Sequence, residues 1–139
     1  MADARKLARI HRVRTLQLGL VQADEARAQA RLANEDQLAD RIGSLVAAIA
    51  PAPANASAAS LIAAAHFRDR LHVSAAAADG RRNAARLAAD RAAEATRAAK
   101  RDQTAVQKLL ERAQVEAALA EMRALEEAPP TRSVRHDPC

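Results

Sequence analysis

The sequence predicts an all-α protein in which two long antiparallel helices form a coiled-coil hairpin. The chain has 139 residues, enough for one domain, and its apolar half is mostly alanine, with Phe67 as the one aromatic residue. So little bulk cannot fill a layered core, because aromatic side chains bury the most area per residue. Proline is absent before Pro51 and between Pro53 and Pro129, which permits two long helices. A charged share of 28% with abundant Ala, Arg, Glu and Leu is typical of coiled coils.

The first helix is expected over residues 3–50. Its apolar residues recur at steps of three and four or their multiples, which places them on one face. These residues are Leu18, Val21, Ala28, Leu32, Ala39, Ile42, Val46 and Ile49. Two acidic residues, Glu25 and Glu35, interrupt this face. A related apolar stripe continues upstream at Leu7, Ile10, Val13 and Leu20.

The turn is expected at residues 51–56 and the second helix at 57–127, with Asn55 or Ser57 as the capping residue. A single glycine costs about 1 kcal/mol inside a helix, so the helix is expected to continue through Gly80. Small side chains dominate its predicted seam, which consists of Ala85, Ala88, Ala92, Ala95, Ala99, Val106, Leu109 and Ala113.

Folding the chain back at the turn sets a predicted register between the helices. Leu45 is expected opposite Ile62, and Leu20 opposite Leu87. The second helix is expected to extend past the first from about Gln107. The hairpin then forms one domain over residues 1–128, followed by a short disordered tail at 129–139.

Neither secretion nor a membrane span is expected. Basic residues run through the first fourteen positions, where the apolar part of a secretory signal would lie. Residues 42–65 lack charge, but they are mostly alanine and contain Pro51 and Pro53. The sole cysteine, Cys139, excludes an intrachain disulfide. We expect a cytoplasmic protein.

No catalytic motif is present. The sequence has no glycine-rich phosphate loop, no HExxH and no CxxC. His66 and His72 are six residues apart, which does not align them as metal ligands on a helix. Carboxylates mostly have an Arg or Lys three or four residues away, as surface ion pairs do. We therefore expect no enzyme activity, no cofactor and no metal.

The net charge of +5 is unevenly distributed. Residues 1–20 carry five basic and one acidic side chains, and residues 81–112 carry nine and four. In a hairpin these basic stretches lie side by side at the open end. The two basic stretches form either a solvated face with ion pairs along it or a surface that binds an acidic partner or phosphates. The candidate residues are Arg5, Arg9, Arg12, Arg97, Lys100, Arg101 and Lys108.

Bulky apolar side chains gather near the turn. The first helix carries a stripe at i, i+4, i+7 and i+11, and the second carries an aromatic-xxx-Leu pair. The residues are Leu38, Ile42, Leu45, Ile49, Phe67 and Leu71. They are either the core of the hairpin or, because two helices bury one face each, a partly exposed site for a partner.

Two segments carry a resemblance to a known family. The opening Lys6–Gln17 (KLARIHRVRTLQ) is basic and apolar, and Ala99–Arg112 (AKRDQTAVQKLLER) is a basic stretch of the second predicted helix. They are similar to the start and to the basic C-terminal helix of the FliJ family of flagellar type III export proteins. The resemblance spans about residues 5–127. It implies a non-catalytic stalk, resembling the central stalk of rotary ATPases, whose open end enters the ring of the export ATPase.

The resemblance also implies further partners. Family members contact the membrane-embedded export gate and handle empty export chaperones, at the inner face of the cell membrane. Their gate-binding surface has the spacing of the stripe near the turn and of the Phe67–Leu71 pair. This chain departs from the family in having Leu and Ile where polar or Tyr side chains are often found. The alternatives are an injectisome stalk, a nucleic-acid-binding coiled coil and a structural scaffold that dimerises into a four-helix bundle.

Overall fold

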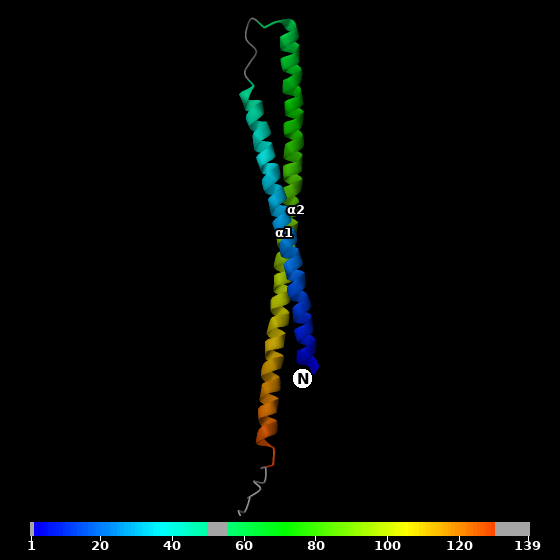
Figure 1. The fold of residues 1–139 in the computed structure, drawn as a ribbon, viewed down its shortest axis with the longest axis vertical. Helices are drawn as coiled ribbons and strands as arrows, with labels where there is room; N and C mark the ends of the chain where they lie inside the picture. Colours follow the sequence, from blue (N-terminus) through cyan, green and yellow to red (C-terminus); the bar gives the residue numbers. More distant parts are fainter. Residues whose placement is uncertain (1, 50–55, 130–139) are drawn as a thin grey trace, which may run out of the picture. The chain divides into compact units, whose positions relative to one another are not determined.

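The protein consists of two long helices. The computed structural model describes residues 2–49 and 56–129, in which α1 spans Ala2–Ala48 and α2 spans Ala58–Glu126 (Figure 1). The helices are antiparallel and in close contact, and no strand occurs among these residues. The all-α helical hairpin is therefore confirmed. Asn55, most of the predicted turn and the tail beyond Pro129 lie outside the described residues.

Ser57 begins the second helix as its cap. The backbone N–H of Ser60 donates a hydrogen bond of 3.2 Å to the Ser57 hydroxyl oxygen, which satisfies one of the amide groups left without a partner in the first turn. The backbone N–H of Leu61 donates to the Ser57 carbonyl oxygen at 3.0 Å. From there α2 continues without interruption through Gly80, as predicted.

The helices pack in two compact units. The central unit comprises Leu16–Lys100, and the terminal unit comprises residues 1–15 and 101–139, described over 2–15 and 101–129. In the central unit, all eight apolar positions predicted for the first helix are half-buried, and Glu25 and Glu35 lie on the same face. In the terminal unit, α1 contributes Ala4, Leu7 and His11 to the contact. The upstream stripe predicted for this part of the helix is wrong at Ile10 and Val13, which are exposed.

Alanine forms the most buried part of the seam. Ala78 and Ala89 are each 1% exposed and Ala85 is 6% exposed. Val21 accepts a hydrogen bond of 3.3 Å at its carbonyl oxygen from the Thr96 hydroxyl. One heptad away from that pair, the register brings Ala28 opposite Ala89. Two facing methyl groups let the helix backbones approach closely, which larger side chains prevent.

The seam predicted for the second helix is partly wrong. Five of the eight predicted positions are buried or half-buried against α1, and the other three are exposed. The five are Ala85, Ala92, Ala99, Val106 and Ala113. The exposed positions are Ala88, Ala95 and Leu109, and their C-terminal neighbours Ala89, Thr96 and Leu110 take their places. Alanine occupies both candidate faces of α2, so the spacing of apolar residues does not distinguish them.

The predicted register is also wrong. Thr96 is the contact of Val21, and Arg81 is the contact of Glu35, whereas the prediction placed Leu87 opposite Leu20. The true partners lie more than two helical turns further along α2. Leu20, Leu45, Ile62 and Leu87, which the predicted register paired, are all exposed.

Polar residues at the seam explain this register. In the central unit, Arg81 and Arg82 meet Glu35 and Asp36 at 3.3 Å and 3.8 Å. In the terminal unit, His11 and Gln103 share a hydrogen bond of 3.0 Å. Charged and polar groups that are partly buried need partners, and an alanine surface accepts many registers equally well. The matched polar pairs therefore select one of them.

The register leaves two stretches of α2 without α1 beside them. In the central unit, α1 ends at Ala48, thirteen residues after Glu35. Counting thirteen residues back from Arg81, the contact of Glu35, places Ala48 opposite Arg68. Residues Ala58–Phe67 of α2 therefore lie past the end of α1 (Figure 1). In the terminal unit, the His11–Gln103 contact places the start of α1 near Arg112, not Gln107 as predicted. Residues from Val115 to Glu126 therefore have no α1 neighbour.

Candidate partner-binding surfaces

Three arginines form an exposed basic surface on α1 in the terminal unit. Arg5, Arg9 and Arg12 follow one another at steps of four and three, on the face turned away from Leu7 and His11. No ion pair within the described part of the chain engages these three side chains. We call them the basic surface. Their charges are uncompensated there and available to an anionic partner.

Other cations of α1 are already paired within the terminal unit. Arg14 contacts the Asp102 carboxylate of α2 at 3.5 Å, and Lys6 contacts Asp3 at 3.8 Å. The Arg14 pair joins the two helices. Both pairs are largely exposed, so each contributes at most about 1 kcal/mol.

The seven cations predicted as one site are distributed over both units. Arg5, Arg9, Arg12, Arg101 and Lys108 belong to the terminal unit, whereas Arg97 and Lys100 belong to the central unit. Arg97 is engaged by Glu94, with guanidinium to carboxylate distances of 2.7 Å and 3.0 Å. All seven side chains are exposed.

The predicted apolar site near the turn is divided between core and surface. Ile42, Ile49 and Leu71 are half-buried where the helices meet. Leu38, Leu45 and Phe67 are exposed, the last two at 57% each. Three of the six residues are therefore available to a partner, and the other three pack within the hairpin.

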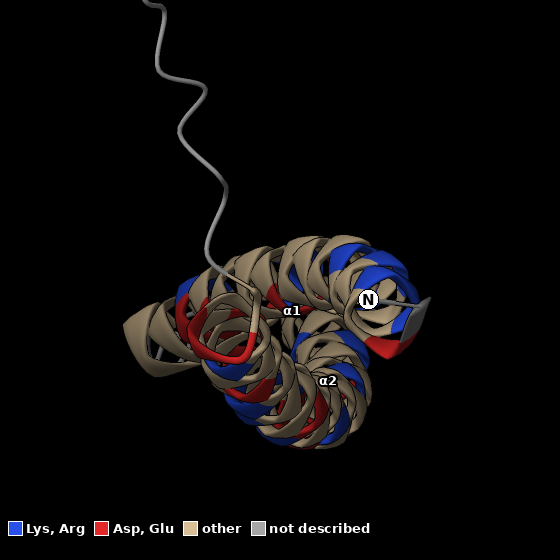
Figure 2. Cartoon of the chain, turned by 90° about the horizontal axis from the view of Figure 1, so that it is seen from below, with Lys and Arg blue, Asp and Glu red and all other residues tan. Residues whose placement is uncertain are grey.

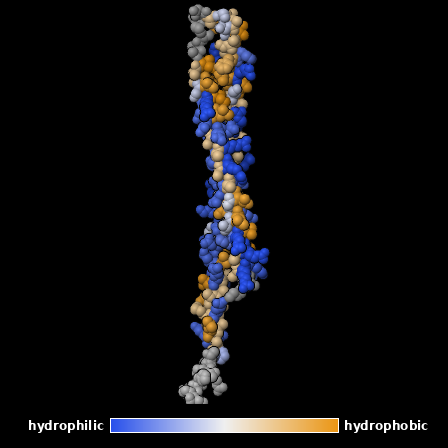
Figure 3. All heavy atoms as spheres, viewed as in Figure 1, coloured by the Kyte–Doolittle hydropathy of each residue, from blue (hydrophilic) through white to orange (hydrophobic). Residues whose placement is uncertain are grey.

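The three exposed residues lie on one side of the helix pair. Each precedes a seam residue by one position: Leu38 before Ala39, Leu45 before Val46, and Phe67 before Arg68. Two antiparallel helices are related by a two-fold axis perpendicular to the plane that contains both of them. Rotation about this axis brings equivalent positions of the two helices onto each other without moving them to the opposite side of that plane. We call Leu38, Leu45 and Phe67 the turn-side apolar surface. Figure 3 shows hydrophobic atoms gathered in this part of the central unit.

Leu61 and Ile62 extend the exposed apolar residues of α2 near the turn, and the sequence analysis missed them as surface residues. They are 46% and 71% exposed because they lie in the stretch past the end of α1. Their apolar character was visible in the sequence, but the wrong register placed Ile62 against Leu45. Only the register of the helices distinguishes this surface from core.

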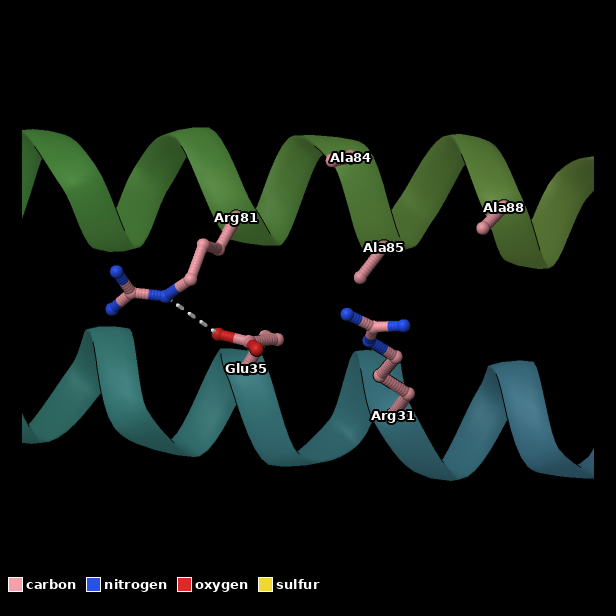
Figure 4. Close-up of a pocket in the computed structure, with 6 residues that line it drawn as sticks. All are labelled: Arg31, Glu35, Arg81, Ala84, Ala85 and Ala88. Carbon is pink, nitrogen blue, oxygen red and sulfur yellow. Dashed lines mark hydrogen bonds and ion pairs between the residues drawn. The ribbon is translucent and has the colours of Figure 1, made fainter.

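A small hollow opens between the helices in the central unit. It has a volume of about 190 Å³ and lies beside Ala84, Ala85 and Ala88, whose short side chains leave the space empty (Figure 4). Arg31 extends from α1 into the space between the helices toward Ala85, and Arg81 meets Glu35 at the other side of the hollow. The one carboxylate that lines the hollow is thus already paired with a guanidinium.

The described part of the chain has no cluster of metal-ligating residues and no membrane-spanning stretch. No three His, Cys, Asp or Glu side chains gather there as metal ligands do. Neither α1 nor α2 has a stretch apolar enough to cross a membrane. Comparison of the chain with known protein families, with curated proteins and with solved structures finds no match.

Proposed function

We propose that this protein is a non-catalytic stalk of a type III protein export apparatus, which binds the ring of the export ATPase. The observation that carries the proposal is the basic surface on an antiparallel helix pair: three exposed arginines without an ion pair among the described residues. Such a helix pair is thin enough to enter a ring, and its cations suit an acidic inner wall.

The turn-side apolar surface supports a second contact within the same apparatus. Exposed apolar side chains that gather on one side of a protein usually mark a partner site. The membrane-embedded export gate is the partner that the resemblance to the FliJ family implies for this region. Export chaperones are its further implied partners, and the inner face of the cell membrane is its implied location.

ATP hydrolysis by the flagellar export ATPase of the same organism tests the proposal. Wild-type protein is titrated into the ATPase at low salt, and a saturable rise is expected at less than one chain per ATPase subunit. Substitution of Arg5, Arg9 and Arg12 by Glu should remove most of the stimulation, because each introduced carboxylate repels the acidic wall that the arginine met. No stimulation by wild type at any ratio would refute the stalk.

The matched control reverses three arginines elsewhere. Arg41, Arg70 and Arg86 are exposed, belong to the central unit and have no ion pair within the described residues. Their substitution by Glu changes the net charge equally and should leave stimulation near the wild-type value. Equal loss in both triple variants would show an effect of net charge alone, and would refute the basic surface as the ATPase contact.

The exposed cations also favour a second candidate, a nucleic-acid-binding coiled coil. Phosphate binding through Arg5, Arg9 and Arg12 would release counterions, so affinity would fall steeply as salt rises. The chain has no aromatic residue beside these arginines for base stacking. Binding of duplex DNA that survives physiological salt, together with absent ATPase stimulation, would replace the stalk with this function.

A further inference from the structure

The last three turns of α2 carry an exposed apolar stripe. Val115, Leu119 and Met122 are 58%, 42% and 54% exposed, and they lie at steps of four and three on one face of the helix. This part of α2 extends beyond the start of α1 in the terminal unit. We call these three residues the end stripe.

The end stripe is not a continuation of the seam with α1. The half-buried positions Leu110, Ala113 and Ala117 continue at heptad spacing to Ala120 and Ala124. Beyond Leu110, alanine alone occupies that line, while the bulky apolar residues lie on a different face. A stripe of large apolar residues on a face turned away from α1 is available to another helix.

Acidic side chains outnumber basic ones in the part of α2 that carries the end stripe. Residues 113–128 contain Glu116, Glu121, Glu126 and Glu127 but a single cation, Arg123. None of these carboxylates has an ion pair within the described residues. The face therefore suits a helix that is apolar along its centre and positively charged at its edges.

The outer face of α1 in the same unit has that chemistry. Ile10 and Val13 are 46% and 53% exposed, and Arg9 and Arg12 precede them directly in the chain. Figure 2 shows Lys and Arg around the start of α1, and Asp and Glu where α2 ends. Within one chain α1 turns Leu7 and His11 toward α2, so its outer face cannot reach the end stripe of the same molecule.

We propose that two copies of this chain associate through their terminal units, with the end stripe of each copy on the outer face of α1 of the other. The contact occurs twice in such a dimer. The end stripe of the first copy meets α1 of the second copy, and the end stripe of the second copy meets α1 of the first. Each copy contributes one acidic and one basic face. The proposal does not depend on the function proposed above.

Sedimentation velocity of the purified protein tests the association. Wild type is expected to form a dimer that weakens as salt screens the exposed charges. Two variants reverse one face each: Arg9→Glu with Arg12→Glu, and Glu116→Arg with Glu126→Arg. Each variant alone should raise the dimer dissociation constant by about tenfold or more, since attraction becomes repulsion at both contacts.

Mixing the two variants gives the decisive result. In the mixed dimer one contact has both faces reversed and the other has both faces native, so both contacts are again complementary. A dimer is therefore expected in the equimolar mixture at concentrations where neither variant dimerises alone. Circular dichroism of each variant verifies its helix content. If a double variant does not fold, the corresponding single variant, Arg9→Glu or Glu116→Arg, is used in its place.

Three outcomes would overturn the proposal. The first is a wild-type protein that stays monomeric at every concentration up to its solubility. The second is a dimer that both reversed variants retain, which would place the interface elsewhere, for example at the turn-side apolar surface. The third is two monomeric variants whose mixture stays monomeric. Arg41→Glu with Arg70→Glu, in the central unit, is the control and should dimerise as wild type does.

Discussion

Replacement of Ala89 by Leu tests which face of α2 meets α1. Ala89 is 1% exposed, and the register set by Val21 and Thr96 places it opposite Ala28. A leucine adds three carbon atoms where two methyl groups face each other, so the helices must separate or the side chain must leave its preferred rotamer. Overpacking of this kind costs about 1–3 kcal/mol.

Ala95→Leu is the matched control. Ala95 belongs to the seam that the sequence predicted but is exposed in the structure. The two substitutions are chemically identical and both lie in the interior of α2, so the change in helix propensity is the same. An exposed substitution of this kind changes the free energy of unfolding by less than about 0.5 kcal/mol.

Thermal and urea unfolding, followed by circular dichroism, measures both variants. The expected loss for Ala89→Leu corresponds to a fall in Tm of about 3–15 °C, whereas Ala95→Leu should unfold close to wild type. Equal losses, or a larger loss for Ala95→Leu, would refute the observed seam and restore the one predicted from spacing. Measurement at several protein concentrations separates hairpin stability from self-association.

Two further predictions concern the turn region. Ser57→Ala should destabilise the protein by about 1 kcal/mol in urea unfolding, because the Ser60 amide loses its acceptor. The control is Ser74→Ala, an exposed substitution in the middle of α2. An equal effect of the two substitutions would contradict the capping role of Ser57. Leu45→Ala with Phe67→Ala should lower Tm much less than Ile42→Ala with Leu71→Ala, because the first pair is 57% exposed at each residue and the second lies in the seam. A collapse of helix content in the first pair would show that Leu45 and Phe67 are core residues, and would remove the turn-side apolar surface.

The sequence determined the fold class and, from Leu18 onward, the inward face of the first helix. Two features were sufficient: the absence of proline from two long stretches, and bulky residues such as Leu18, Leu32 and Ile42 at helical spacing. On α1 only one face combines such residues in a continuous line. Periodicity therefore identifies it without knowledge of the partner.

The tertiary structure alone decided the inward face of α2 and the register. Ala88 and Ala89 are chemically the same, and an alanine surface packs against α1 almost equally well in many alignments. The selection rests on pairs far apart in the chain, such as Glu35 with Arg81 and His11 with Gln103. No local pattern encodes such a match, because its energy exists only when both helices are in place.

The candidate surfaces depend on that same decision. Sequence alone showed that Phe67 and Val115 are apolar and that Arg9 and Glu116 are charged. Whether an apolar residue is core or surface depends on where the neighbouring helix begins and ends beside it. The register placed Ala48 opposite Arg68 and the start of α1 near Arg112, and thereby left apolar residues of α2 exposed in both units.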